Sequence, residues 1–311
     1  MSLNRPIYKL LHWIDINDLD WDMLSFNTRA IKLLEENPEK INWDYLSLNE
    51  NAIELLEKNP ENIYWNMLSF NKNAIKLLKK QREKINWNDL SENRNAISLL
   101  EEKLLERRNK IDWSNLSHNP NAIKILEANP KKIDWKHLSL NENAIHLLEK
   151  NPDKINWSNL SRNKNAIKLL EKQRDKIDWK QLSENINAIK LLEENMDKID
   201  WKQLSLNENA IHLLERNMEK IDWFNLSINE NSIRLFENHK DKIDWLNLSH
   251  NPSIFELDYE KMKENNQEMY EDLIKEVMKP SRVFKNPEYD YLEELFGGIV
   301  WRLNFFYIIK L

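Results

Sequence analysis

Tryptophan recurs along this chain at a fixed step, and no other feature constrains the fold as strongly. Eleven tryptophans follow one another from Trp21 to Trp245 every 22 residues, with one longer interval between Trp87 and Trp113. The repeated unit is clearest from Ile133, where the sequence is IDWKHLSLNENAIHLLEKNPDK. A repeat this short predicts units that cannot bury a core alone and that stack on their neighbours.

Each unit predicts two short helices joined by tight turns. An Asp or Asn precedes the tryptophan in ten of the eleven units, Tyr64 being the exception, and such a side chain caps a first helix over the segment WxxLS. An asparagine two residues after the serine is expected to cap a second helix, whose NAIxLLE pattern has apolar residues at helical spacing. That helix is expected to end at Asn-Pro, as in Asn151-Pro152, with the asparagine in the left-handed conformation.

The predicted fold class is all-α. We expect an α-solenoid in the form of a superhelical rod, made of about eleven 22-residue two-helix repeats with N- and C-terminal caps. Residues 1–18 are predicted to form the N-terminal cap, residues 19–258 the repeat array, and residues 259–311 a C-terminal helical cap and a hydrophobic tail.

One unit carries an insertion near residues 101–108. Its four extra residues correspond to about one helical turn. We therefore expect the second helix of this unit to be one turn longer, with Leu104 and Leu105 on the same face as Leu99 and Leu100.

The composition argues against catalysis and cofactor binding. The chain has no cysteine and only two glycines, Gly297 and Gly298, which leaves no thiolate metal site and little for a phosphate-binding loop. The seven histidines are scattered, and no group of serine, histidine and acid stands out. We expect no enzyme activity, no metal and no cofactor.

Charge and hydropathy also bear on partners. A net charge of −6 does not favour nucleic acid or an anionic membrane. No signal peptide is visible, and the apolar run at residues 295–311 contains Arg302, Asn304 and Lys310. It falls short of the roughly 20 residues that a membrane-spanning helix needs. We expect a terminal cap there, or self-association through this tail.

The tryptophans and the polar ladders each allow two interpretations. The favoured one places the indoles in the structural core, next to Leu and Ile; an aromatic platform for sugars, bases or proline-rich peptides is the alternative. The core set comprises Trp43, Trp65, Trp135, Trp157, Trp179, Trp201 and Trp223. The repeated serines and asparagines are expected to cap helices and bridge units, with a polar ligand groove as the alternative.

A row of lysines precedes the caps at repeat spacing, from Lys40 to Lys242. Such a row could follow a phosphate backbone, but the preceding residue is usually acidic, as at Asp153 and Asp175. Nucleic-acid binding along this lysine ladder is therefore the least favoured of the alternatives.

The variable position between the serine and the asparagine supplies the candidate partner contacts. An intermittently apolar row occupies it: Phe26, Leu48, Phe70, Leu140, Leu206 and Ile228. A contiguous exposed apolar strip is typical of an interface.

The unit pattern IDWxxLSxNPNAIxLLExNPDK and the segment NPSIFELDYEKMKENNQEMYEDLIKEVMKPSR, from Asn251 to Arg282, resemble a known family. It is the family of tryptophan-containing, 22-residue helical repeat proteins encoded by giant, mimivirus-like DNA viruses. The resemblance covers residues 10 to 285; Lys279 stands where members usually have histidine, and the last 25 residues do not match. It implies a fold and a viral origin, with location in the host cytoplasm or the virion, but no activity.

The expected function is a non-catalytic scaffold for protein–protein interaction, because stacked units make an extended surface whose variable positions do not disturb the core. The partner is a host or viral protein. A structural component of the virion or of a viral assembly is the alternative.

Overall fold

The computed structural model describes residues 6–106, 110–265 and 275, and the chain divides into two units. The larger unit, Tyr8–Glu256, contains the repeats. The smaller unit comprises Met1–Ile7 and Leu257–Leu311, and within it the described residues 259 to 265 are helical. The predicted fold class, an all-α solenoid of two-helix repeats, is confirmed.

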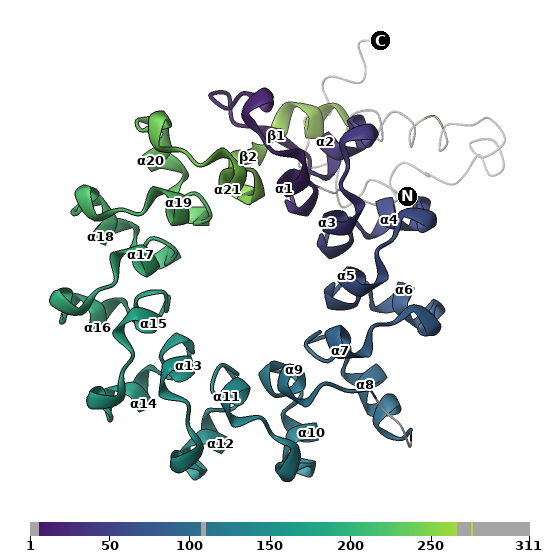
Figure 1. Cartoon of the computed structure of the whole chain (residues 1–311). Helices are drawn as coiled ribbons and strands as arrows, with labels where there is room; N and C mark the ends of the chain where they lie inside the picture. Colours follow the sequence, from purple (N-terminus) through teal and green to yellow (C-terminus); the bar gives the residue numbers. More distant parts are fainter. Residues whose placement is uncertain (1–5, 107–109, 266–274, 276–311) are drawn as a thin grey trace, which may run out of the picture. The chain divides into compact units, whose positions relative to one another are not determined.

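The first helix of each unit lies on the inner side of the array (Figure 1). These inner helices are α1 (Trp21–Phe26), α3 (Trp43–Leu48), α5 (Trp65–Phe70), α7 (Trp87–Leu90), α9 (Trp113–His118), α11 (Trp135–Leu138), α13 (Trp157–Arg162), α15 (Trp179–Ser183), α17 (Trp201–Leu204), α19 (Trp223–Leu226) and α21 (Trp245–His250). The predicted caps are present: the Asp20 carboxylate accepts from the Met23 amide at 2.8 Å, whereas Tyr64 makes no side-chain cap bond.

The second helix of each unit lies on the outer side (Figure 1). These outer helices are α2 (Ile31–Glu36), α4 (Ile53–Lys58), α6 (Ile75–Lys80), α8 (Ile97–Leu104), α10 (Ile123–Ala128), α12 (Ile145–Lys150), α14 (Ile167–Glu171), α16 (Ile189–Glu193), α18 (Ile211–Glu215) and α20 (Ile233–Glu237). A 3₁₀ turn follows most of them: η2 (Pro38–Lys40), η3 (Pro60–Asn62), η4 (Arg82–Lys84), η5 (Pro130–Lys132), η6 (Pro152–Lys154), η7 (Arg174–Lys176), η8 (Met196–Lys198), η10 (Met218–Lys220) and η12 (Lys240–Lys242). Two more precede outer helices, η9 (Glu208–Ala210) and η11 (Glu230–Ser232).

Both ends of the outer helices differ from the prediction. Helix α2 begins at Ile31 rather than directly after Asn27, and its N-cap Ala30 has no side-chain bond. Asn27 Oδ1 accepts from the Arg29 amide at 3.0 Å and so caps the turn that precedes the helix, while Asn27 Nδ2 donates between units. At the other end Asn37 has φ of −135°, outside the left-handed region. Its Nδ2 donates to the Leu33 carbonyl at 2.8 Å, so an asparagine is favoured there by that bond instead.

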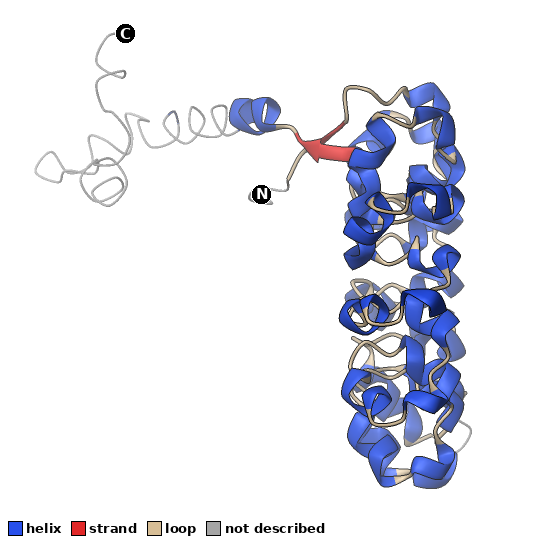
Figure 2. Ribbon diagram, turned by 90° about the vertical axis from the view of Figure 1, so that its left-hand side faces the viewer, coloured by secondary structure: helices blue, strands red, loops and turns tan. Residues whose placement is uncertain are grey.

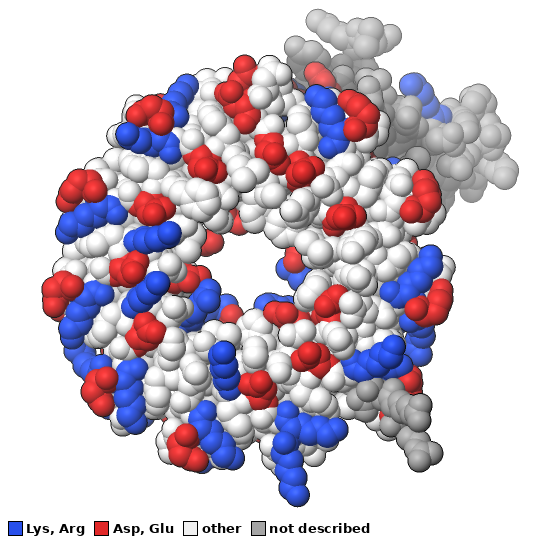
Figure 3. Space-filling view, viewed as in Figure 1, with Lys and Arg blue, Asp and Glu red and all other residues white. Residues whose placement is uncertain are grey.

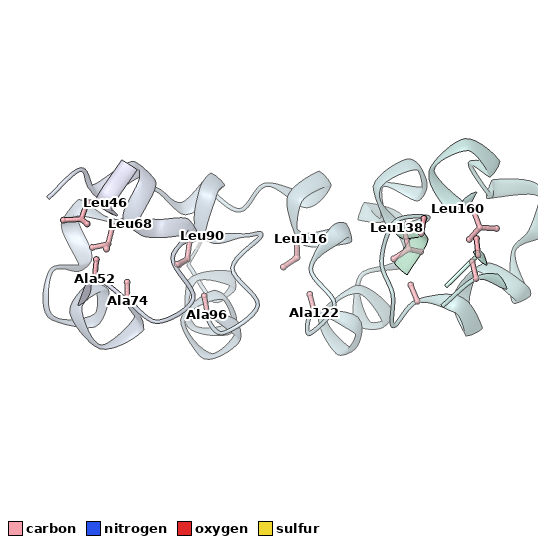
Figure 4. Close-up of a cluster of buried hydrophobic side chains, with 14 of the residues drawn as sticks. Leu46, Ala52, Leu68, Ala74, Leu90, Ala96, Leu116, Ala122, Leu138 and Leu160 are labelled. Atoms are coloured by element: carbon pink, nitrogen blue, oxygen red, sulfur yellow. The ribbon is translucent and has the colours of Figure 1, made fainter. Parts of the chain in front are cut away.

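The core is a continuous layer between inner and outer helices. In most units a fully buried leucine of the inner helix faces a fully buried alanine just before the outer helix, as for Leu46 and Ala52 or Leu68 and Ala74 (Figure 4). Ser232 replaces the alanine after α19. Alanine allows the two helices to approach closely, and helices of about six residues are stable only through such packing.

The insertion lengthens the outer helix less than predicted. Helix α8 has eight residues against six in α6 and α10. Leu104 packs against the core, but Leu105 is 88% exposed, so the prediction that Leu105 repeats the buried face is wrong. Residues 107–109 of the insertion lie outside the described part.

The array closes into a ring, which corrects the predicted rod. Helix α21 packs against α1, strand β1 (Tyr8–Leu10) pairs with β2 (Phe255–Leu257), and the Leu11 amide donates to the Ile254 carbonyl at 2.9 Å. Edge-on, the array is flat rather than a rising superhelix (Figure 2). Small rotations between units therefore add up to one full turn.

The predicted N-terminal cap consequently does not cover an open end. Its described residues, which include η1 (Ile16–Asp18), supply the second half of the last unit, after α21 and η13 (Pro252–Ile254). Of the predicted C-terminal cap, the helix over Tyr289 to Phe296 and the tail 295–311 lie outside the described residues. Within the described residues no helix is both long and apolar enough to cross a membrane.

Candidate interaction surface of the ring

A buried hydrogen-bond belt joins neighbouring units all round the ring. Each serine of an inner helix accepts from the cap-residue amide of the next unit, as Ser25 Oγ does from the Asn42 amide at 2.9 Å. Each belt asparagine donates to carbonyls of the preceding unit, as Asn49 Nδ2 does to Ser25 and Asn27 at 3.0 and 2.9 Å. These side chains are buried, and every bond joins protein groups, which is the bridging interpretation of the ladders.

The belt continues without a break where the two chain ends meet. The Asp20 amide donates to Ser249 Oγ at 2.8 Å, and Asn27 Nδ2 donates to the carbonyls of Ser249 and Asn251, both at 3.0 Å. We call this junction the seam. Arg29 reinforces it by donating to the Pro252 and Phe255 carbonyls at 3.2 and 3.3 Å.

The tryptophans predicted as structural core pack against the core but remain partly exposed. Their other face is covered by lysine: Lys84 Nζ lies 4.6 Å from the Trp65 ring centroid, and equivalent contacts recur at 4.6, 4.8, 4.6 and 4.5 Å over Trp135, Trp157, Trp179 and Trp201. Trp223 instead stacks on His239, with centroids 5.1 Å apart. In the unit that follows Trp43, Asn62 occupies the repeat position that carries lysine elsewhere. Most lysines of the ladder are thus engaged in cation–π contacts, whereas Lys242 pairs with Asp241.

The candidate contact row runs round the inner helices, and some successive members contact each other. Glu92 pairs with His118 Nδ1 at 3.0 Å, and Arg162 donates to Glu184 at 2.8 Å. Together with Leu140, the Glu92–His118 pair lines a hollow of about 100 Å³ that also contains Arg94, Pro120 and Glu142. The hydrogen bond from His118 lowers the pKa of Glu92.

Closure joins two stretches of this row that lie far apart in the sequence. Phe26 and His250 occupy equivalent positions, and their rings stack across the seam with centroids 4.5 Å apart. Burial lowers the pKa of His250, which keeps it neutral near pH 7. Five of the six candidate residues therefore occupy, together with His250, successive positions of one arc. We call this set the apolar arc: Leu206, Ile228, His250, Phe26, Leu48 and Phe70. Leu140 lies apart from it, between His118 and Arg162 in the row.

The position two residues after each tryptophan was missed by the sequence analysis. It is occupied by Met23, Tyr45 and Met67 in α1, α3 and α5, and Tyr45 is 37% exposed. In later units this position carries Asp, Asn, Gln or His, and Asn159 Nδ2 bridges to the Lys136 carbonyl at 2.8 Å. The sequence contained a signal for this surface, because three successive units have large apolar residues at a position where the other units are polar.

Within the described residues no group of three or more His, Asp or Glu side chains is arranged to hold a metal ion. No family model, curated protein or solved structure matches the chain. The surface chemistry of the ring is therefore what bears on function.

Proposed function

We propose that the protein is a non-catalytic scaffold that binds other proteins through the inner surface of its ring. One observation carries the proposal: closure turns a scattered row of apolar residues into the contiguous apolar arc. Phe70 and Ile228 are each 36% exposed, and their neighbours in the arc are partly exposed. A contiguous, partly exposed apolar strip on a rigid support is typical of a protein interface.

The design of the unit supports the same proposal. The buried belt and the leucine–alanine core are nearly identical from unit to unit, whereas the position of the contact row varies from Phe to Glu to Arg. Variation confined to the surface allows the contact chemistry to change without a loss of stability.

The alternatives have less support. Structural bridging by a rod requires free repeat faces at the ends, and the described array pairs its first and last units. Binding of nucleic acid along the lysines competes with their contacts to tryptophan and with the neighbouring acids. A giant-virus origin and a place in the virion stay predictions.

A capture experiment tests the proposal. Tagged wild-type protein and the F70E/L206E variant are compared by quantitative mass spectrometry of what each retains. The matched control is Y64E/M196E, which changes two exposed apolar residues away from the arc, 42% and 38% exposed. We expect the control to retain the wild-type partners and F70E/L206E to lose them, because charges placed in the arc must be desolvated on binding. Equal capture by all three proteins would exclude the arc.

A further inference from the structure

The strongest unassigned feature is an apolar wall on three neighbouring inner helices. Two positions of each inner helix, two and five residues after the tryptophan, lie opposite the buried Leu and Ser on a helix of 3.6 residues per turn, and so face the central opening. In α1, α3 and α5 both positions are large and apolar. We call this set the methionine wall: Met23, Phe26, Tyr45, Leu48, Met67 and Phe70.

The wall is continuous because its three helices pack directly on one another. Its composition suits a binding surface that adapts to the partner, since methionine is flexible and polarizable and fills irregular gaps. No other run of three inner helices in the described array has apolar residues at both positions.

Acidic side chains border the wall. Asp22 and Asp44 follow the tryptophans of α1 and α3, and both are exposed. Asp89 stands on the next helix, α7, where burial raises the pKa of its carboxyl group. Among the described residues no lysine or arginine forms an ion pair with these three acids. Carboxylates at the edge of an apolar surface attract a partner that carries cations beside its own apolar residues.

At the position after the tryptophan, the opposite side of the ring carries lysine instead of aspartate. Lys136, Lys180 and Lys202 occupy on α11, α15 and α17 the position that Asp22 and Asp44 occupy on α1 and α3. Figure 3 shows charged side chains of both signs around the opening. A basic partner is therefore directed to the acidic side, where the methionine wall lies.

The opening has room for such a partner. Eleven inner helices about 8 to 10 Å apart, each about 10 to 12 Å thick with side chains, enclose an opening of roughly 20 Å, which exceeds the thickness of one helix. The space-filling view shows the ring open at its centre (Figure 3).

We propose that the methionine wall binds a basic amphipathic helix of a partner protein, with an apolar stripe on the wall and lysines or arginines next to Asp22, Asp44 and Asp89. This inference rests on the proposed scaffold function and names the chemistry of its partner. It follows the general mode in which an apolar helix face packs on an apolar surface and charge sets the choice of partner.

Two fluorescent model peptides of roughly 18 residues test the inference, long enough to be helical when bound. Both have Leu and Phe at helical spacing; one has lysines beside this stripe and the other has glutamates. We expect the lysine peptide to bind the full-length protein at least about tenfold more tightly than the glutamate peptide, with affinity that falls as salt is added. Equal binding of both peptides would overturn the basic partner class while leaving protein binding intact.

Two variants of equal charge change locate the site. D22K/D44K reverses two border acids, and E39K/E219K reverses two exposed acids on η2 and η10. We expect the first to weaken lysine-peptide binding about tenfold and the second to change it less than about twofold. Because Asp22 also accepts from Asn42 Nδ2 at 3.0 Å, D44K alone is the second test if the double variant folds poorly.

Methionine methyl NMR gives a readout that does not depend on variants. Met23 and Met67 lie in the wall, whereas Met196 and Met218 lie on η8 and η10. The lysine peptide is expected to shift the first pair and leave the second unchanged. If neither Met23 nor Met67 shifts, the wall is not the site, whereas the scaffold proposal is decided separately by the F70E/L206E capture.

Discussion

The seam and an internal junction such as α3–α5 use the same hydrogen bonds but differ in what supports them. At α3–α5 the chain continues from unit to unit, and Ser47 accepts from the Tyr64 amide at 3.0 Å. At the seam Ser249 accepts from Asp20 at 2.8 Å, but the two sides come from opposite ends of the array. Ring closure therefore depends on non-covalent contacts alone, whereas an internal junction is also held by the continuous chain and can lose some of these contacts without separating.

The seam also has two stabilising features that internal junctions lack. A two-stranded sheet, β1–β2, replaces an outer helix, and Arg29 stands where other units have an asparagine such as Asn51. Asn51 Nδ2 donates to one carbonyl, that of Thr28, at 2.9 Å, whereas Arg29 reaches two carbonyls and lies 5.3 Å from the Tyr8 ring centroid. A longer, charged donor thus compensates for the missing chain connection.

The largest difference between the junctions is expected from belt asparagines. N27A removes the donors to Ser249 and Asn251, and N71A removes those to Ser47 and Asn49. Each variant removes the side-chain donor from a buried serine carbonyl, whereas the Asn251 and Asn49 carbonyls keep the amides of Ile254 and Ala52. An unsatisfied buried carbonyl costs roughly 1 to 3 kcal/mol. Only N27A is expected to open the ring, seen as a larger radius of gyration by small-angle X-ray scattering. If N27A keeps the wild-type radius of gyration and has the same free energy of unfolding as N71A, the seam is as strong as an internal junction.

The second largest loss of seam stability is expected on replacing Arg29. R29A is expected to cost about 1.5 to 3 kcal/mol because a charged donor to two carbonyls is lost, against about 1 kcal/mol for N51A. Amide hydrogen exchange at Leu11, whose N–H bonds to Ile254, should accelerate in R29A and remain slow in N51A. Similar protection of Leu11 in both variants would remove Arg29 from the closure.

Acid should weaken the seam before the internal junctions. The folded pKa of His250 is lowered by burial, with Glu230 acting in the opposite direction, so below the ordinary value of 6.5 the unfolded chain binds more protons and stability falls. At α7–α9 the pKa of Glu92 is lowered by the His118 bond, so its contribution persists until the pH falls below the ordinary value of 4.5. Between pH 7.5 and 5.5 the melting temperature should drop in the wild type and less in H250Q. An equal drop in both proteins would contradict this role of His250.

The smallest expected effect concerns the tryptophan–lysine contacts. Lys40 lies 4.3 Å from the Trp21 centroid, whereas Asp18 occupies the position equivalent to Lys40 in the unit that follows Trp245 across the seam. K40M should lose, and D18K should gain, about 0.5 to 1 kcal/mol of cation–π stabilisation in urea denaturation. No gain in D18K would show that the seam geometry differs from that of an internal junction.

The sequence predicted the parts of the fold that are local. The N-caps, exemplified by Asp20, and the leucine–alanine core follow from spacing and residue type within one unit. The start of the outer helix at Ile31 could not be predicted, because Asn27 Oδ1 caps a turn that precedes the helix rather than the helix itself.

Closure could not be read from one unit either, because it depends on a small rotation summed over the whole array. Two hints were present in the sequence: Arg29 interrupts the asparagine series, and the segment from Asp15 to Trp21 matches the end of a unit without its beginning. The methionine wall was identified in part, since Phe26, Leu48 and Phe70 were named but Met23, Tyr45 and Met67 were not. The contiguity of the arc required the ring.

The central claim is that the first and last units are neighbours. Because the chain lacks cysteine, spin labels can be placed only where wanted, at D22C/L246C across the seam and at D44C/N66C across α3–α5. Double electron–electron resonance should give the same short distance for both pairs. A seam distance of several tens of Å, approaching the roughly 100 Å length of an open stack of eleven units, would contradict the ring.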